Sequence, residues 1–259
     1  MLYSKMKTFK LVLLLTLLAM PVLATDIKTG EDVVASMYKK YAGKWYKTLT
    51  FVQKTTTHKP DGTESAETWY EAMTVPGKLR IDIVPLEKGN GIIFADGKLF
   101  SFREGKLAGS RPFVHPLLVL GFDVYGQPVE TTIGQIKGLG IDMTTVHEEK
   151  WQGQDVYVVG AKQGDLNTAQ FWVSKKDLLF VRLIQLGGRD KKIVQETQFN
   201  KYVKVKGGGW VSAEVKFFND GKLVTSEDYT DIQAGTALTS DLWNPEKWLT
   251  VDKSYYKKQ

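Results

Sequence analysis

Residues 75–103 read VPGKLRIDIVPLEKGNGIIFADGKLFSFR, and this stretch decides the fold. Aromatic and β-branched residues gather in three short runs, which is typical of β-strands. The runs are residues 78–84, 91–95 and 98–103. Pro76-Gly77 precedes the first run, and Asp96-Gly97 separates the last two. So short a connection joins neighbouring strands antiparallel, because a parallel crossover needs a dozen residues or more. The stretch therefore predicts part of an antiparallel β meander.

The same pattern extends to both sides of this stretch. Further strands are predicted over residues 45–57, 68–75, 140–147, 155–161, 169–173, 178–185, 193–205, 210–218 and 222–231. Turn signals such as Pro60-Asp-Gly62 and Asn219-Asp-Gly221 lie between them. Apolar and polar residues alternate along 211–217, so one face of the sheet is expected to be apolar. About a dozen strands and few helices predict a strongly curved sheet.

Two segments are predicted to be helical and to cover the apolar face of the sheet. Thr29 lies three residues before Asp32, and apolar residues then recur with helical spacing, which predicts an amphipathic helix over residues 30–42. Residues 112–122 form a compact apolar segment with Pro116 suited to a first helical turn. Because no other segment shows a comparable apolar helical pattern, these two are the expected cover, either as core or as a lid.

The N-terminus has the pattern of a secretory signal peptide. Lys5, Lys7 and Lys10 precede an apolar run over residues 11–20, and small residues end the pattern at Ala24. The alternative is a membrane anchor, but the apolar run is shorter than the ~20 residues that cross a bilayer. We expect cleavage after Ala24, a signal peptide over residues 1–24, and a single exported domain over residues 25–259.

Composition narrows the function further. The chain has no cysteine, so disulfides, thiolate chemistry and a cysteine-linked lipid anchor are excluded. Removal of three lysines with the signal peptide lowers the net charge from +6 to +3. The basic tail over residues 253–258 is predicted to be a solvated end, and no feature indicates nucleic-acid binding.

A search for catalytic and metal-binding motifs predicts neither an enzyme nor a cofactor. The three histidines, His58, His115 and His147, are isolated from one another. His147 precedes two glutamates, but adjacent strand residues point to opposite faces, which favours a solvated turn over a cation site. Gly134, Gly138 and Gly140 lack a nucleotide-binding spacing and are interpreted as turns or bulges. Two acids on distant strands can converge, although no acidic residue stands out by its setting. The seven tryptophans share no spacing and are assigned to packing.

Three motifs follow one another in the first half of the chain, and their order indicates a known family. They are Phe51-Val-Gln53, Val75-Pro-Gly77-Lys-Leu-Arg80 and Asp96-Gly97-Lys98-Leu-Phe100-Ser-Phe102. Over residues 30–105 the chain resembles the LolA-like outer-membrane lipoprotein-sorting proteins, and residues 151–159 and 171–182 resemble that family's closing hairpins more weakly. The chain from Gly207 onward extends beyond the resemblance.

The resemblance implies a mainly β (α+β) fold, an antiparallel open or incomplete β-barrel whose concave face is covered by an N-terminal helix and a short helical lid. It implies a monomeric periplasmic carrier that takes lipid or lipoprotein acyl chains from an inner-membrane donor complex toward an outer-membrane acceptor. An acyl chain gains ~0.8 kcal/mol for each CH₂ group hidden from water, so such shelter is physically needed. The alternative is an envelope binding or sensor module with a protein partner.

The resemblance also suggests the residues of the ligand cavity. The predicted wall consists of apolar strand residues: Leu79, Ile81, Ile83, Ile92, Phe94, Phe100 and Phe102. The predicted lid consists of Leu117, Leu118 and Phe122. An ordinary packed core is the alternative for each, since apolar strand faces are usually core. Val75 stands where the family's carriers have an arginine that helps to fasten the lid. Arg80 matches a family arginine, and it is alternatively an outward-facing strand residue.

Overall fold

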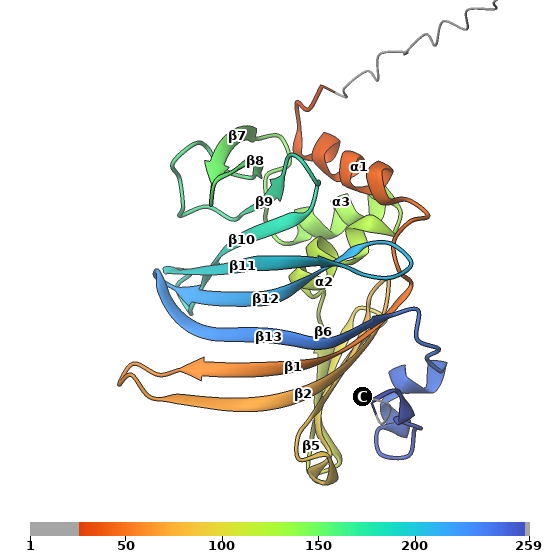
Figure 1. Cartoon of the computed structure of the whole chain (residues 1–259). Coiled ribbons are helices and arrows are strands. Elements are labelled where there is room, and N and C mark those ends of the chain that lie inside the picture. The colour runs from red at the N-terminus through yellow and green to blue at the C-terminus, as the bar shows by residue number, and fades with distance from the viewer. Residues whose placement is uncertain (1–25, 257–259) are drawn as a thin grey trace, which may run out of the picture.

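The computed structural model describes residues 26–256, and these form one 13-stranded antiparallel sheet with few helices (Figure 1). The strand order is β6-β5-β4-β3-β2-β1-β13-β12-β11-β10-β9-β8-β7. The strands are β1 Thr48–His58, β2 Glu64–Thr74, β3 Lys78–Ile83, β4 Asn90–Ala95, β5 Lys98–Arg103, β6 Lys106–Pro112, β7 Val146–Trp151, β8 Gln154–Val159, β9 Gln170–Ser174, β10 Phe180–Gly187, β11 Ile193–Lys204, β12 Trp210–Asn219 and β13 Lys222–Ala234.

The sheet is open, because the edge strands β6 and β7 lie at opposite ends of the strand order. At its centre β1 pairs with β13, so that Leu49 lies opposite Ala234 and Thr57 lies opposite Thr225. Every other pairing joins strands that are consecutive in the sequence. The predicted open antiparallel barrel is therefore confirmed, and one long-range pairing joins the two halves of the sheet.

Three α-helices cover the concave face: α1 Gly30–Tyr41, α2 Pro116–Gly121 and α3 Val129–Gly138 (Figure 1). The first two confirm the predicted helices. Thr29 caps α1, since its hydroxyl accepts a hydrogen bond from the Asp32 backbone N–H at 3.2 Å. In α2, Pro116 occupies the first helical position. No described helix is long and apolar enough to cross a membrane.

The structure corrects several predictions between residues 104 and 147. Strand β6 and helix α3 were not expected, and the interpretation of Gly134 and Gly138 as turn residues was wrong because both lie in α3. The strand predicted over residues 140–147 begins only at Val146. Before it, the Asp142 carboxylate accepts a hydrogen bond from the Thr144 backbone N–H at 2.8 Å, which builds a turn.

The segment beyond the resemblance supplies both central strands and cover for the convex face of the sheet. It contributes β12 and β13 and then the residues 238–256, which we call the C-terminal strap. The strap contains three 3-10 helices: η3 Ser240–Trp243, η4 Pro245–Lys247 and η5 Ser254–Tyr256. Two others lie elsewhere, η1 Leu86–Lys88 and η2 Asp123–Tyr125. The strap packs its apolar residues on Ala72, Ile93 and Phe102, forming a second core separate from the main one.

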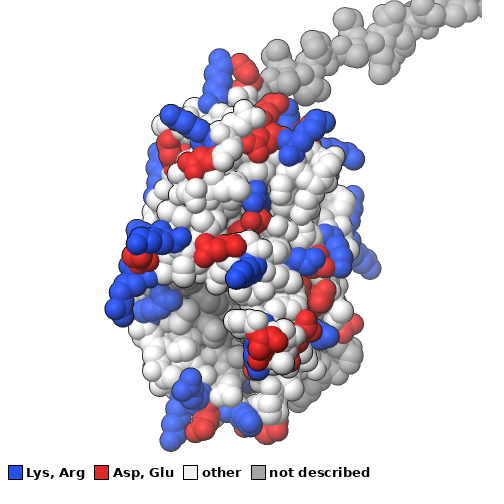
Figure 2. Space-filling model, turned by 90° about the vertical axis from the view of Figure 1, so that its left-hand side faces the viewer, with Lys and Arg blue, Asp and Glu red and all other residues white. Residues whose placement is uncertain are grey.

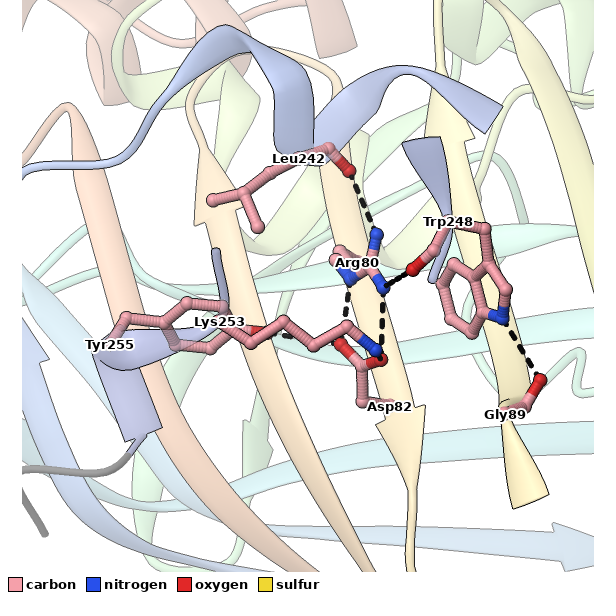
Figure 3. Close-up of polar contacts among 7 residues, drawn as sticks. All are labelled: Arg80, Asp82, Gly89, Leu242, Trp248, Lys253 and Tyr255. Carbon is pink, nitrogen blue, oxygen red and sulfur yellow. Dashed lines mark hydrogen bonds and ion pairs between the residues drawn. The ribbon is translucent and has the colours of Figure 1, made fainter. Parts of the chain in front are cut away.

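A buried ionic network fastens the strap to β3 (Figure 3). Arg80 is fully buried and holds the Asp82 carboxylate with two hydrogen bonds of 2.7 and 3.0 Å. The Arg80 guanidinium also donates to the Trp248 carbonyl at 2.8 Å and lies 3.9 Å from the centre of the Trp248 ring. Lys253 and Tyr255 reach the same carboxylate at 2.8 and 3.1 Å. The prediction of a solvated tail is therefore wrong for Lys253 and Tyr255. Arg80 points away from the concave face, and its side chain is buried beneath the strap.

Candidate functional site

A cavity of about 230 Å³ lies on the concave face beneath α2. Its walls come from β1 to β4, from β11 to β13 and from the α2 segment, and most of the residues are aliphatic or aromatic. They are Phe51, Gln53, Trp69, Glu71, Met73, Leu79, Ile81, Ile92, Phe94, His115, Leu117, Leu118, Phe122, Phe199, Phe217, Glu227 and Tyr229.

Seven of the ten predicted cavity residues line this space. The strand residues are Leu79, Ile81, Ile92 and Phe94, and the lid residues are Leu117, Leu118 and Phe122. Neighbouring strands bring the first four together, because Leu79 pairs with Phe94 and Ile81 pairs with Ile92. The three lid residues come from α2 and its C-terminal end. Their assignment to ligand binding stays a prediction.

Three predicted wall residues lie outside the cavity. Ile83 faces the same side and packs against the main core without lining the space. Phe100 and Phe102 lie on the opposite face, where the Phe102 ring stacks on Trp248 at 4.1 Å. Their placement in the wall is corrected by the register of the β4–β5 hairpin, which pairs Phe94 with Leu99 and Ile93 with Phe100. An even-numbered residue of β4 therefore shares its face with odd-numbered residues of β5.

The sequence interpretation missed the part of the cavity that comes from β1, β2 and the last strands. Phe51, Trp69 and Met73 occupy odd positions of β1 and β2, whose side chains share the concave face. Their alternation along the sequence carries this signal. Phe217 and Tyr229 join them from β12 and β13, which reach the cavity through the pairing of β1 with β13. That long-range pairing has no local signature in the sequence.

Four polar side chains form the floor of the cavity, which we call the polar floor: Gln53, Glu71, Glu227 and Tyr229. The Tyr229 hydroxyl donates a hydrogen bond of 2.8 Å to the Glu227 carboxylate. Burial raises the pKa of Glu227 from 4.5 to about 7, and hydrogen bonds from Tyr229 and Gln53 offset part of this effect. Burial and the nearby Glu227 raise the pKa of Glu71 well above its usual value. Two acids on distant strands thus converge in an apolar site.

The lid is held by few polar contacts. The Nδ1 atom of His115 accepts a hydrogen bond from the Leu117 backbone N–H at 3.2 Å and caps α2. Beyond α2, the buried Asp123 carboxylate accepts a hydrogen bond from the Gly77 backbone N–H at 2.9 Å, which ties the lid to the β2–β3 turn. Burial raises the pKa of Asp123 to about 7. Val75 is a buried residue of the main core. A backbone contact to Asp123 fastens the lid here.

A second cavity of about 350 Å³ adjoins the first and shares His115, Leu117 and Phe217 with it. It extends to Asn219 at the end of β12, on the left-hand side of Figure 1. Figure 2 views the molecule from that side and shows a hollow with Lys, Arg, Asp and Glu side chains at its rim. The cavity therefore continues toward this side of the molecule.

Two other features offer weaker sites. A groove of about 600 Å³ lies near β11 and β12, but mostly polar side chains such as Gln198, Glu214 and Lys216 line it. His147 contacts the Glu149 carboxylate at 3.0 Å on β7, because residues two apart on a strand share a face. Within residues 26–256, no group of three or more acidic or histidine side chains is arranged to hold a metal ion.

Proteins of known structure share this fold. No protein-family model matches the chain, and no curated protein matches it. Among solved structures, a DUF1329 family protein from Desulfovibrio piger aligns with a TM-score of 0.55 at 14% identity, over 83% of this chain and 95% of that one. A LolA superfamily protein from Nitrosomonas europaea aligns with a TM-score of 0.51 at 14% identity, over 81% and 96%.

A domain from Vibrio parahaemolyticus described as an outer membrane lipoprotein-sorting protein aligns with a TM-score of 0.56 at 12% identity. It covers 85% of this chain and 97% of that one. Identities this low establish the fold and leave ligand and reaction to be argued from the site. The chain described here has the LolA-like fold.

Proposed function

We propose that this protein is an exported carrier that binds acyl chains of lipids or lipoproteins in its concave cavity and takes them toward the outer membrane. The observation that carries the proposal is an apolar cavity that is covered by a short helix, α2, of six residues. The LolA-like fold of the solved neighbours supports it. The signal peptide predicted over residues 1–24 lies outside the described residues, and its cleavage belongs to the proposal.

The energetics favour an acyl chain as cargo. Each methylene moved from water into the cavity contributes ~0.8 kcal/mol, so a chain of about ten methylenes contributes about 8 kcal/mol. The cavity of about 230 Å³ is smaller than the ~300–1,000 Å³ of typical small-molecule sites. A full chain therefore needs the adjoining space of about 350 Å³ or an outward shift of α2.

The contacts of the lid are suited to such a shift. A single side-chain hydrogen bond, between Asp123 and the Gly77 backbone, joins the end of the lid to the β2–β3 turn. A hydrogen bond of this kind contributes about 1–3 kcal/mol, which is less than the gain from one buried chain. Leu118, Val119 and Leu120 of α2 are also buried in the main core, so the gain from the chain has to exceed the cost of exposing them unless the shift keeps them packed. Release to an acceptor follows the same path in reverse.

The second candidate function is an envelope binding or sensor module that uses the fold to hold a protein partner. Such a module needs an exposed apolar patch and a filled interior. The large apolar residues that are exposed within residues 26–256 are scattered: Val84, Leu107, Val114, Leu166, Val203 and Leu249. The open cavity favours the carrier, for which a donor complex in the inner membrane and an acceptor in the outer membrane are the proposed partners.

The test is native mass spectrometry with lipid extraction on the exported protein purified from an envelope fraction. Ile92 lines the cavity, whereas Leu99 lies on the same face of the neighbouring strand and packs on the core outside it. Ile92→Trp fills the cavity and is expected to remove bound lipid, and Leu99→Trp is the matched control that keeps it. Thermal unfolding confirms that both variants fold. A lipid-free wild type, or equal lipid in the two variants, contradicts the carrier.

A further inference from the structure

Glu71 is a buried acid without a hydrogen-bond partner. Its side chain lies on β2, is 4% exposed and lines the concave cavity. None of the described residues donates a hydrogen bond to its carboxyl group. Buried polar groups are almost always hydrogen-bonded, because leaving one unpaired costs free energy. Glu71 faces the cavity, so water or a ligand in the cavity can supply this donor.

A second acid faces the same space. Glu227 lies on β13, which is separated from β2 only by β1, and it also lines the cavity. Tyr229 and Gln53 hydrogen-bond Glu227 and hold it in place, whereas Glu71 is free to receive a ligand. Burial, and after it the charge of Glu227, raises the pKa of Glu71 well above its usual value, and both carboxyl groups line the same cavity. The polar floor thus offers two acceptors to one ligand group.

No cation offsets these acids. None of the cavity-lining residues is a lysine or an arginine. His115 is the one basic side chain among the lining residues, and burial lowers its pKa to about 4, so the ring is neutral at pH 7. An anionic group such as a carboxylate or phosphate would meet two acids and no cationic side chain among the lining residues. A positively charged group would be attracted to Glu227 and would supply the donor that Glu71 lacks.

We propose that the polar floor binds the protonated amine of an amphiphile whose apolar chain lies along the cavity wall. The amine donates hydrogen bonds to Glu71 and Glu227, and the chain packs on Ile81, Ile92 and Phe94. This inference rests on the proposed carrier function and specifies the class of ligand. It distinguishes cationic amphiphiles from fatty acids and from lipids with purely anionic heads.

The experiment compares three ligands of equal chain length at pH 8, where Glu227 is ionised. Dodecylamine, dodecanol and dodecanoate are titrated into the exported protein below their critical micelle concentrations, and binding is followed by calorimetry. We expect dodecylamine to bind about 10- to 100-fold more tightly than dodecanol, the gain that hydrogen bonds to charged groups give. Dodecanoate is expected to bind most weakly. Lysophosphatidylethanolamine carries an amine beside a phosphate. Comparing its binding with that of dodecylamine shows whether the site takes a phospholipid head group or an amine without phosphate.

Variants separate the polar floor from the rest of the cavity. The double variant Glu71→Gln, Glu227→Gln is expected to bring the ratio of amine to alcohol affinity close to one. Glu64→Gln removes an acid from the exposed start of the same strand and is expected to keep the preference. Equal binding of the three ligands to wild type, or a preference that survives the double variant, overturns this inference and leaves the carrier standing. Binding of none of them contradicts the carrier as well.

Discussion

Asp82 holds together the network that fastens the C-terminal strap, and its loss should cost more than the loss of either cation. The carboxylate is 2% exposed and is shared by Arg80, Lys253 and the Tyr255 hydroxyl. Asp82→Asn removes the negative charge that balances Arg80. The Arg80 side chain is fully buried, so its positive charge would stay out of contact with water. Arg80→Met, in contrast, leaves Asp82 paired with Lys253 at 2.8 Å.

The magnitude follows from this asymmetry. Removing one partner of a buried ion pair destabilises a protein by about 3–5 kcal/mol, because the other charge stays buried without compensation. We expect Asp82→Asn to lower the free energy of unfolding by this amount. Arg80→Met loses hydrogen bonds to the strap but strands no charge, so we expect about 1–3 kcal/mol. Lys253→Met is expected to cost about 1 kcal/mol, since its ammonium lies at the edge of the network.

Urea unfolding followed by tryptophan fluorescence measures these differences, since Trp248 lies 3.9 Å from the Arg80 guanidinium. Arg182 and Glu196 form a comparable two-bonded pair on β10 and β11, and they remain 9% and 14% exposed. Glu196→Gln is therefore the matched control, with an expected cost of about 1–2 kcal/mol. If Asp82→Asn costs no more than Glu196→Gln, burial of the network does not govern the attachment of the strap, and the reasoning is refuted.

Three further predictions concern the strap, the floor and the lid. Deletion of residues 238–259 should expose Phe102, increase binding of a hydrophobic dye and lower the unfolding temperature; an unchanged temperature would show that the strap is dispensable. The pKa of Glu227 is raised from 4.5 to about 7 in the folded state, so the folded protein holds a proton that the unfolded chain releases in this window. The unfolding temperature should therefore fall as the pH rises from 5 to 8, and Glu227→Gln should flatten that fall; an equal slope in both proteins would contradict the burial of this acid. Asp123→Ala should speed ligand release about tenfold in stopped-flow displacement, because the Gly77 N–H loses its partner; an unchanged rate would mean that α2 does not gate the cavity.

Local patterns in the sequence identified most of the elements and seven of the seventeen residues that line the cavity. The capping residues Thr29 and Asp32 marked the first helix, and short turns such as Asp96-Gly97 fixed the antiparallel hairpins. Within β5, however, Phe100 and Phe102 were assigned to the wrong face. The resemblance and their apolar character suggested them as wall residues, whereas the two-residue turn places Leu99 and Ser101 on the face of Phe94 and Ile92. Counting the pairing across the turn would have corrected this.

The features that the sequence could not supply depend on distant contacts. Glu71 and Glu227 meet only because β1 pairs with both β2 and β13. Helix α3 contains glycines that weaken a helical signal, and tertiary contacts stabilise it: Ile136 is buried in the main core, and Lys137 forms a 2.7 Å ion pair with Glu31 of α1. Propensity alone gives no reason to expect it. The same holds for the strap, whose apolar residues have no regular period.

The pairing of β1 with β13 also bears on when the molecule becomes competent. Leu49 and Ala234 come from opposite ends of the chain, and the strands that carry them join the two halves of the sheet. Contacts between such distant residues form late, because a long loop must close before any of them is made. A growing polypeptide that lacks β13 has two separate meanders and lacks Glu227 and Tyr229 of the polar floor. If the protein is the carrier proposed above, its cavity is complete only after β13 has been synthesised, so an unfinished chain is not expected to capture lipid.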